Sequence, residues 1–361
     1  FPSKPPAYTQ ELCTACYGQS CGAELQACEA DAFCSGYLKR VRATPSGGYP
    51  APDLLKDVAV ESWESDQGRS NGGKALREFQ ACTKKACRAQ CELGRDFSCT
   101  GRFEWPESRP KFSELRFRVV DYLSGQGANP GVSRLRFRGC PLPNQCPTPM
   151  ATATTDTGGF VAATVDFSLA PPVVTVPEFN GVWLVDGRDD YPPFKLQSTR
   201  PYLDKAYAVS PFFNNDTVPF TRVSGAVIAP PSGTLLVSPF DCRDEYATGV
   251  TLEAYRPIQG GYQSCMNCGK VTYTADNNFP DPSLTEYATL GLIALLNVPA
   301  DDVQDLMLVI RDTASGQPIS VLTRVGVRMD EFLVITMYPA SRKQLDSLPA
   351  GVRLPPMVSP P

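Results

Sequence analysis

The chain has 361 residues, a formal net charge of −4, fourteen cysteines and no histidine. Without histidine, Ser-His-Asp or Cys-His catalysis, histidine-ligated zinc and histidine-ligated haem are excluded. The nearly balanced charge gives no global basic field for nucleic acid, and 42% hydrophobic residues are enough for packed cores. The longest apolar run, within residues 290–296, is much shorter than the roughly 20 residues that a membrane span needs.

The cysteine content indicates the compartment. Nine of the fourteen cysteines fall within the first hundred residues, a density typical of a disulfide framework in an oxidising environment. We therefore expect a secreted, periplasmic or outer-membrane surface protein. Phe1 follows no charged-then-apolar leader, which predicts a mature form after removal of a signal peptide. A lipid anchor would be attached to a cysteine at position 1, where this chain has Phe1, so lipid anchoring stays an open alternative.

The N-terminal third predicts a small helical unit. Residues 1–10 form a proline-rich arm, and residues 11–105 form a cysteine-rich helical module. A helix is expected over residues 74–93, with Ser70 or Asn71 as its N-cap and Gly94 as its C-cap. Antiparallel helices stapled by disulfides are the favoured interpretation, and a metal cluster is the alternative. The cysteines are Cys13, Cys16, Cys21, Cys28, Cys34, Cys82, Cys87, Cys91 and Cys99.

The rest of the chain predicts strands. In residues 112–200 apolar and polar residues alternate with period two, and glycine-rich turns separate the runs, as in half-buried antiparallel strands. Residues 201–221 are taken as a linker, residues 222–340 repeat the plan, and residues 341–361 are taken as a proline-rich tail. The expected fold is therefore mainly β, with two tandem antiparallel β-sandwiches behind the helical module. The predicted strands after residue 112 include 160–167, 179–186, 223–228, 234–238, 249–255, 270–274, 287–298, 305–311 and 332–338.

Two segments resemble known families. Gly131-Val132, the turn Thr155-Asp156-Thr157-Gly158-Gly159 and the strand at 181–185 are similar to a carboxypeptidase regulatory-like, prealbumin-type β-sandwich, and residues 222–340 resemble a diverged second copy. The pattern Cys21, Glu24-Leu25, Cys28, Asp31, Cys34 resembles the cysteine-rich modules of myxobacterial and related deltaproteobacterial envelope lipoproteins. The resemblance implies a non-catalytic protein and assigns no functional residue.

The cysteine counts predict a bridge between segments. The three segments hold nine, two and three cysteines, so complete pairing requires a bridge from the helical module to Cys242, Cys265 or Cys268. Cys140 and Cys146 are expected to pair with each other. For Cys265-Met-Asn-Cys268 a structural bridge is favoured over a redox motif or a metal site, because the surrounding sequence reads as a hairpin rather than a helix N-terminus.

Charged and aromatic clusters are the remaining candidates for binding. Five arginines would form a cationic stripe on one sheet face if their strands pair, suited to carboxylates, phosphates or sulfates; a solvated face is the plainer interpretation. They are Arg116, Arg118, Arg134, Arg136 and Arg138. Acidic clusters at 186–190 and 301–305 are weak calcium candidates. Trp105, Tyr191, Tyr202, Phe212 and Phe213 are expected to pack at segment junctions.

The sequence thus predicts a non-enzymatic envelope-surface protein with a structural or adhesive role, an accessory subunit that binds protein partners in a larger assembly. No cofactor, metal or catalytic residue is expected. The first alternative is an anionic-glycan-binding module that uses the arginines, and the second is a hydrolase that relies on carboxylates alone.

Overall fold

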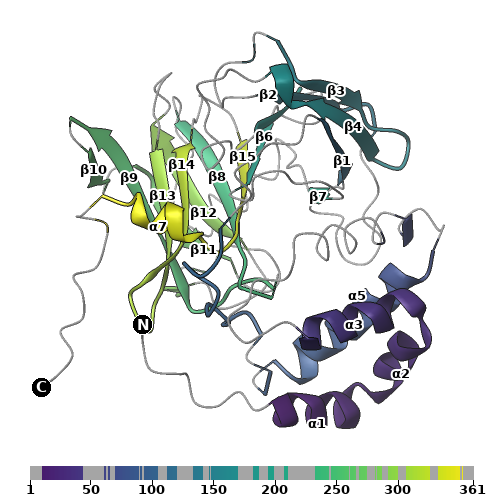
Figure 1. Cartoon of the computed structure of the whole chain (residues 1–361). Helices are drawn as coiled ribbons and strands as arrows, with labels where there is room; N and C mark the ends of the chain where they lie inside the picture. Colours follow the sequence, from purple (N-terminus) through teal and green to yellow (C-terminus); the bar gives the residue numbers. More distant parts are fainter. Residues whose placement is uncertain are drawn as a thin grey trace, which may run out of the picture.

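A computed structural model of the chain shows a bundle of helices at one end of a larger β-rich body (Figure 1). The description covers residues 10–43, 61, 64–65, 70–104 without 89 and 92, 112–119, 133–140, 146, 148–169, 182–186, 194–198, 207–209, 232–265 without 244 and 260, 268–274, 281, 283–286, 292–299, 306–325, 332–349 and 352. Residues 1–9 of the predicted arm at 1–10, the strand at 223–228 and the five junction aromatics lie outside these residues, and residue 10 begins the first helix.

The helical module consists of α1 (Gln10–Ser20), α2 (Gly22–Ala30), α3 (Ala32–Ala43) and α5 (Gly72–Ala86). Asp31 accepts a hydrogen bond from the backbone N–H of Cys34 at 2.8 Å and so caps the start of α3. The apolar face of α5 buries Leu76 and Phe79 against Leu38 and against the Cys28–Cys34 disulfide. This small core leaves the disulfides to supply much of the stability of the module.

Three disulfides join α1 and the residue that follows it to the end of α5 and the residues just beyond it. Cys13 bonds to Cys91, Cys16 to Cys87 and Cys21 to Cys82, so that the bridges are nested in the sequence. All six sulfurs belong to one cluster with Tyr17 and Leu93 packed against it. The expected pair of antiparallel helices stapled along a shared face is therefore present, although α5 ends at Ala86 rather than near residue 93.

The β-body contains three sheets among the described strands. Their orders are β4-β1-β7, β10-β9-β13-β14 and β11-β12-β8-β15-β6-β5-β2-β3. The strands are β1 (Phe112–Val119), β2 (Arg136–Cys140), β3 (Ala151–Thr154), β4 (Phe160–Asp166), β5 (Val182–Val185), β6 (Phe194–Ser198), β7 (Tyr207–Val209), β8 (Ser232–Pro239), β9 (Val250–Ile258), β10 (Gly261–Ser264), β11 (Lys270–Tyr273), β12 (Ile293–Pro299), β13 (Leu306–Asp312), β14 (Pro318–Val325) and β15 (Phe332–Met337). A 3-10 turn at Phe167–Leu169 follows β4.

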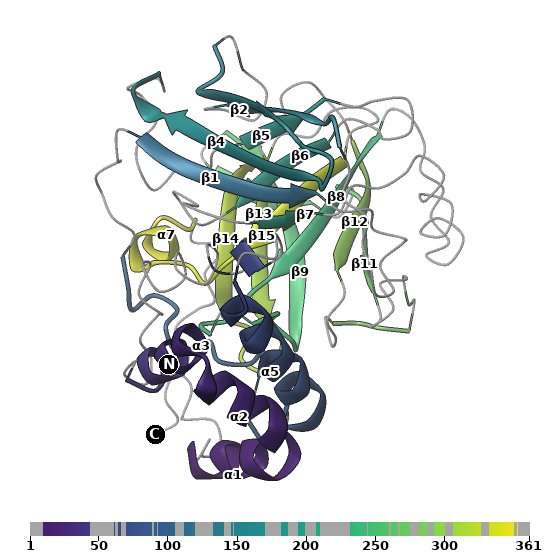
Figure 2. The same ribbon diagram turned by 90° about the vertical axis from the view of Figure 1, so that its right-hand side faces the viewer.

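The mainly β class with a disulfide-stapled helical module is confirmed, but the strand connectivity differs from the prediction. Strand β15 lies between β6 and β8 and is parallel to both, so strands from the two β-rich segments form one continuous sheet (Figure 2). Strand β7 falls within the predicted 201–221 linker and pairs in parallel with β1. Alternation reports which face of a strand is buried, not which strand lies beside it, and this is why the purely antiparallel expectation was wrong. The division into two sandwich domains stays a prediction.

A large core of described residues lies between the β9–β13–β14 sheet and the β12–β8–β15 part of the long sheet. Its fully buried members include Leu235, Ile293, Leu308 and Ile335. On the opposite face of the β9–β13–β14 sheet, Met307 and Val309 contact Ala340, Leu348 and Val352 from the C-terminal segment. The sheet is therefore covered on both faces.

The part of the expected proline-rich tail that the structure describes, residues 341–349 and 352, packs on the β-body. Residues Arg342–Asp346 form helix α7, whose N-cap Ser341 accepts from the Gln344 backbone while the Gln344 side chain accepts from the Ser341 backbone. This reciprocal pair is a capping box, and it satisfies two donors at the start of the helix. Val352, although six residues beyond the helix, is buried. Ala340, Leu348 and Val352 thus cover this face of the sheet.

Candidate functional site

The five arginines do not form one stripe. Arg116 and Arg118 lie on β1, in the β4-β1-β7 sheet, whereas Arg136 and Arg138 lie on β2, in the long sheet. The predicted stripe depended on pairing between these strands. Strand β1 instead pairs with β4 and β7, and β2 with β3 and β5. The prediction of one cationic face is therefore wrong.

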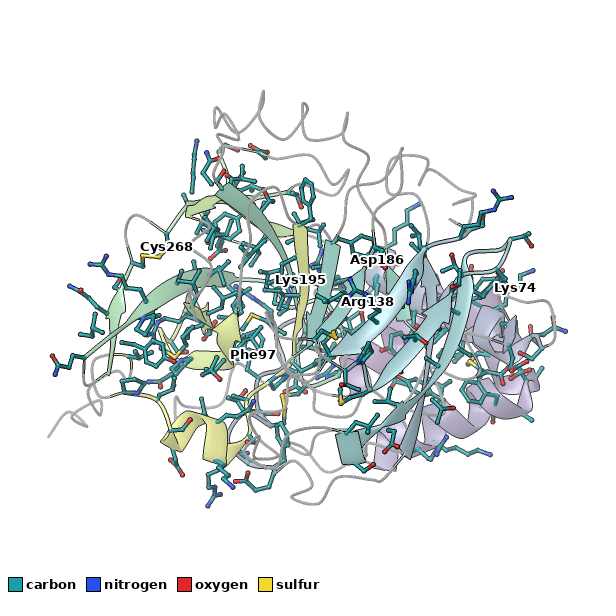
Figure 3. All side chains as sticks on the ribbon, turned by 90° about the horizontal axis from the view of Figure 1, so that it is seen from above. Lys74, Phe97, Arg138, Asp186, Lys195 and Cys268 are labelled. Atoms are coloured by element: carbon teal, nitrogen blue, oxygen red, sulfur yellow. A yellow bond between two sulfur atoms is a disulfide. The ribbon has the colours of Figure 1, made fainter. Side chains whose placement is uncertain are left out.

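The arginines of β2 already have a partner in the chain. Arg138 Nη2 lies 2.6 Å from Asp186 Oδ1, and Arg136 Nε lies 4.0 Å from the other oxygen of the same carboxylate. Figure 3 shows Arg138 and Asp186 side by side on the β-body. Arg134 precedes the strand in the left-handed region, with φ of 64°. The first acidic cluster thus contributes its leading carboxylate to an arginine pair, while Asp189, Asp190 and residues 301–305 lie outside the described residues.

All fourteen cysteines form disulfides, so none is present as a free thiol. Cys140 bonds to Cys146, and Cys265 bonds to Cys268 within the connection from β10 to β11. Within the described part of the chain, no group of three or more cysteine or carboxylate side chains is arranged to hold a metal ion. Nor is any helix in that part long and apolar enough to cross a bilayer.

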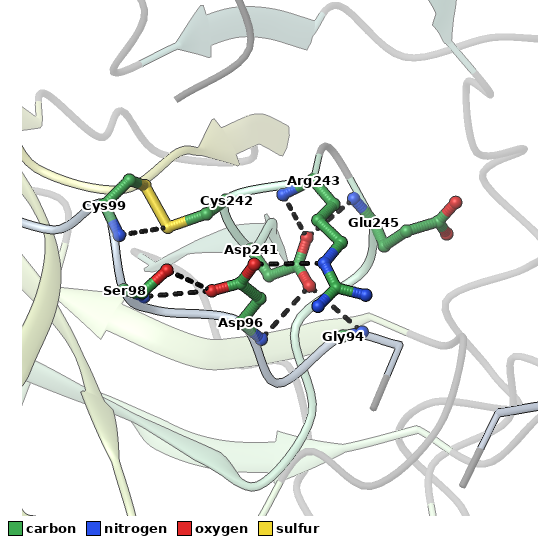
Figure 4. The surroundings of a disulfide bond; sticks show 8 residues. All are labelled: Gly94, Asp96, Ser98, Cys99, Asp241, Cys242, Arg243 and Glu245. Carbon is green, nitrogen blue, oxygen red and sulfur yellow. Dashed lines mark hydrogen bonds and ion pairs between the residues drawn. A yellow bond between two sulfur atoms is a disulfide. The ribbon is translucent and has the colours of Figure 1, made fainter. Parts of the chain in front are cut away.

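The most elaborate polar cluster lies where the helical module meets the β-body, at residues 240–249, which we call the docking loop (Figure 4). At its centre Asp241 is fully buried. Its Oδ2 accepts from the backbone N–H groups of Gly94 at 3.1 Å and Asp96 at 3.3 Å, both from the helical module. Its Oδ1 accepts from the N–H groups of Arg243 at 2.8 Å and Glu245 at 3.0 Å, within the docking loop. One carboxylate therefore holds two segments that are almost 150 residues apart in sequence.

Ion pairs surround this carboxylate. Arg243 Nε donates to Asp96 Oδ2 at 3.0 Å, and its Nη1 donates to the Cys91 carbonyl at 2.8 Å. Lys84, in the last turn of α5, lies 2.7 Å from Glu245. Each of these side chains is mostly shielded from solvent, which makes the pairs stronger than ordinary surface pairs. The helical module is consequently docked by charge as well as by backbone hydrogen bonds.

A covalent bond completes the junction. Cys99 and Cys242 form a disulfide across a sequence separation of 143 residues. The backbone N–H of Cys99 also donates to Cys242 Sγ at 3.0 Å. This is the bridge between the helical module and the third segment that the odd cysteine counts predicted, with Cys242 as the partner in the third segment.

Burial raises the pKa of Asp241 to about 7, because the charged form loses its hydration in the interior. The N–H groups of Glu245 and Arg243 favour the charged form and oppose this rise, while the nearby carboxylates of Glu245 and Asp96 add to it. The charge of the junction therefore changes near neutral pH. The hydrogen bonds, ion pairs and disulfide of this arrangement link the helical module to the β-body.

Sequence reasoning did not single out Asp241, Arg243 or Lys84. The available signal was the position of Asp241 and Arg243 on either side of Cys242, a cysteine already expected to reach another segment. Side chains next to an inter-segment disulfide are carried into the same interface, and this marks them for burial. The role of Lys84 has no comparable local signal.

Comparison with known proteins gives no family. No protein-family model matches the chain, and no curated protein matches it significantly. Among solved structures, a streptococcal ancillary pilin aligns with a TM-score of 0.20 and 10% identity, over 64% of this chain and 69% of the pilin. A putative adhesin from Bacteroides ovatus aligns with a TM-score of 0.16 and 10% identity, over 65% and 91%. A 9R-lipoxygenase from Cyanothece aligns with a TM-score of 0.17 and 15% identity, over 49% and 23%. At these TM-scores none of the alignments establishes a shared fold.

Proposed function

We propose that the protein is a non-enzymatic structural or adhesive component of an extracytoplasmic assembly, in which it acts as an accessory subunit bound to protein partners. The observation that carries this proposal is the complete pairing of fourteen cysteines, including a bridge that ties the helical module to the β-body. Such a framework suits an oxidising compartment and a protein that must keep its shape outside the cell. The proposal includes a relationship to the envelope lipoproteins that the N-terminal cysteine pattern resembles.

The alternative role in anion binding depended on a stripe of arginines on one sheet face, and that stripe does not form. Four of the five arginines are divided between two sheets, and Arg136 and Arg138 share the carboxylate of Asp186. A glycan sulfate or phosphate would have to displace that carboxylate from Arg138. Glycan binding by these arginines is therefore not part of the proposal.

Within this proposal, partner binding is assigned to residues 1–9 and 353–361. Deleting residues 1–9 together with residues 353–361 is expected to leave thermal unfolding unchanged and to reduce the amount of partner protein that co-purifies with the chain. Residues 341–352 must be kept, because Leu348 and Val352 cover the β9–β13–β14 sheet. The matched control is a chain that ends at residue 340. This truncation removes Leu348 and Val352 and should therefore lower the melting temperature. Unchanged recovery of partners by the 10–352 chain would contradict this assignment.

A further inference from the structure

We propose that the disulfides make this protein a load-bearing link, in which tension applied along the chain passes through Cys13–Cys91 and Cys99–Cys242 and bypasses most of the residues. The biological use of this property rests on the proposed structural role. The property itself belongs to the isolated protein and can be measured without any partner.

The covalent path follows from the order of the bridges. Tension that enters before Cys13 crosses directly to Cys91, which removes a separation of 78 residues from the path. Eight residues later it crosses from Cys99 to Cys242 and removes a further separation of 143 residues. Residues 14–90 and 100–241 therefore carry no covalent tension. These stretches hold α2, α3, α5 and all strands from β1 to β8.

The nested bridges protect the helical module further. Cys16–Cys87 and Cys21–Cys82 lie inside the loop that Cys13–Cys91 closes. Reduction of the outer bridge alone would pass the load to the next bridge, which lies only a few residues further along each helix. Three bonds would thus have to open before the helices bear load in sequence.

The load enters and leaves the β-body at neighbouring points. Immediately after Cys99, the N–H of Gly101 donates to the carbonyl of Ala340 at 2.9 Å, and the N–H of Arg342 donates to the carbonyl of Phe103 at 3.1 Å. Because Cys99 is bonded to Cys242, where the load enters the β-body, the point of entry lies close to the start of the C-terminal segment. Because Cys242, where the load enters, and the C-terminal segment, where it leaves, lie close together, the β-body is attached beside the line of tension rather than stretched along it.

The buried side chain of Arg311 holds Val352, the last described residue of the C-terminal segment. Arg311, at the end of β13, donates from Nη2 to the Val352 carbonyl at 2.8 Å and to Tyr255 Oη at 3.1 Å. Its Nε donates to Glu253 Oε2 at 2.7 Å. Leu348 and Val352 pack beside it on the same face of the sheet. These contacts must break before tension from the C-terminal end reaches the strands.

The predicted extensions are large enough to separate the alternatives. A fully stretched chain spans roughly 3.6 Å per residue, so removal of the Cys99–Cys242 bridge should release about 500 Å of additional length. With all bridges intact, the path that remains also extends to about 500 Å by the same rule. Loss of this single bridge should therefore double the final extension.

The experiment is single-molecule force spectroscopy, with handles at the two chain ends, under non-reducing conditions. Wild-type protein is compared with C99A/C242A and with C140A/C146A. The second variant is a matched control, because the Cys140–Cys146 loop lies inside the bypassed stretch and its loss should add no length. The full extension depends on the covalent path alone, so the comparison holds whether or not C99A/C242A folds normally.

We expect full extensions in the ratio of about one to two for wild type and C99A/C242A, with C140A/C146A equal to wild type. Equal extensions for wild type and C99A/C242A, or a longer extension for C140A/C146A, would overturn the proposal. The substitution R311M tests the contacts of Arg311: it should lower the force of the first rupture, whereas R256M on the neighbouring strand should not. Failure of the co-purification test would reject the role in an assembly and leave these lengths unchanged.

Discussion

The Cys99–Cys242 disulfide gives the sharpest prediction on stability, because it closes a far longer loop than most of the other bridges. In the loop-entropy description, a cross-link stabilises the fold by restricting the unfolded chain, and its effect grows with the logarithm of the loop length. A separation of 143 residues corresponds to about 5 kcal/mol at 25 °C. The Cys140–Cys146 bridge, with a separation of 6, corresponds to about 2 kcal/mol.

The perturbations are again C99A/C242A and C140A/C146A. Unfolding by guanidinium chloride without reductant, followed by circular dichroism, gives the free energy of unfolding of each variant. We expect C99A/C242A to lose about 3 kcal/mol more than C140A/C146A. The helical signal of C99A/C242A in native buffer should be preserved, because four disulfides within the helical module remain.

An equal or smaller loss in C99A/C242A would refute the reasoning. It would mean that the two parts of the unfolded chain are not effectively restrained by this bridge, or that the junction contacts hold the folded parts together without it. A second measurement separates these explanations. If the unfolding transition of C99A/C242A divides into two steps, the helical module and the β-body have become independent, and the bridge is what couples them.

The remaining predictions concern the buried carboxylate. D241A should lower the free energy of unfolding by about 2–4 kcal/mol, because four backbone N–H groups lose their acceptor in the interior. D156A is the matched control: Asp156 also accepts from two backbone N–H groups, but in an exposed turn where water replaces it, so its loss should be under about 1 kcal/mol. The stability of wild type should also depend on pH. The pKa of Asp241 is about 7 in the folded state against 3.8 when exposed, so the folded state binds the proton more tightly, and the free energy of unfolding should fall as pH rises from 4 to above 7. Chemical denaturation at pH 5 and pH 8 measures this change, which D241A should abolish; a wild-type stability that rises over this range would contradict the assignment.

The sequence was informative wherever local pattern decides structure. Alternation located most strands, and the cysteine counts located the inter-segment bridge. The capping box of Ser341 and Gln344 is also visible in the sequence and indicates α7, but the prolines that follow favoured the interpretation of a tail. A helix signal four residues long is easily outweighed by the composition of its surroundings.

Long-range pairing could not be predicted in the same way. Nothing in the residues of β15 specifies that it lies between β6 and β8, because an apolar strand fits any sheet position that buries both faces. The same limitation explains Lys195, which is 1% exposed although it carries a charged group, because β6 lies inside the long sheet rather than at its edge. The split of the arginines between sheets is a further consequence of pairing that no local pattern encodes.

The position of β15 also determines when the protein can fold. Strand β15 spans residues Phe332–Met337, so the two halves of the long sheet cannot join until residue 337 has been synthesised. Until then β6 and β8 each present an open edge to which other chains can bind. Contacts between residues so far apart in sequence form slowly, which prolongs this exposure. The edges of β6 and β8 that β15 covers in the folded protein are therefore the strand edges exposed longest during folding.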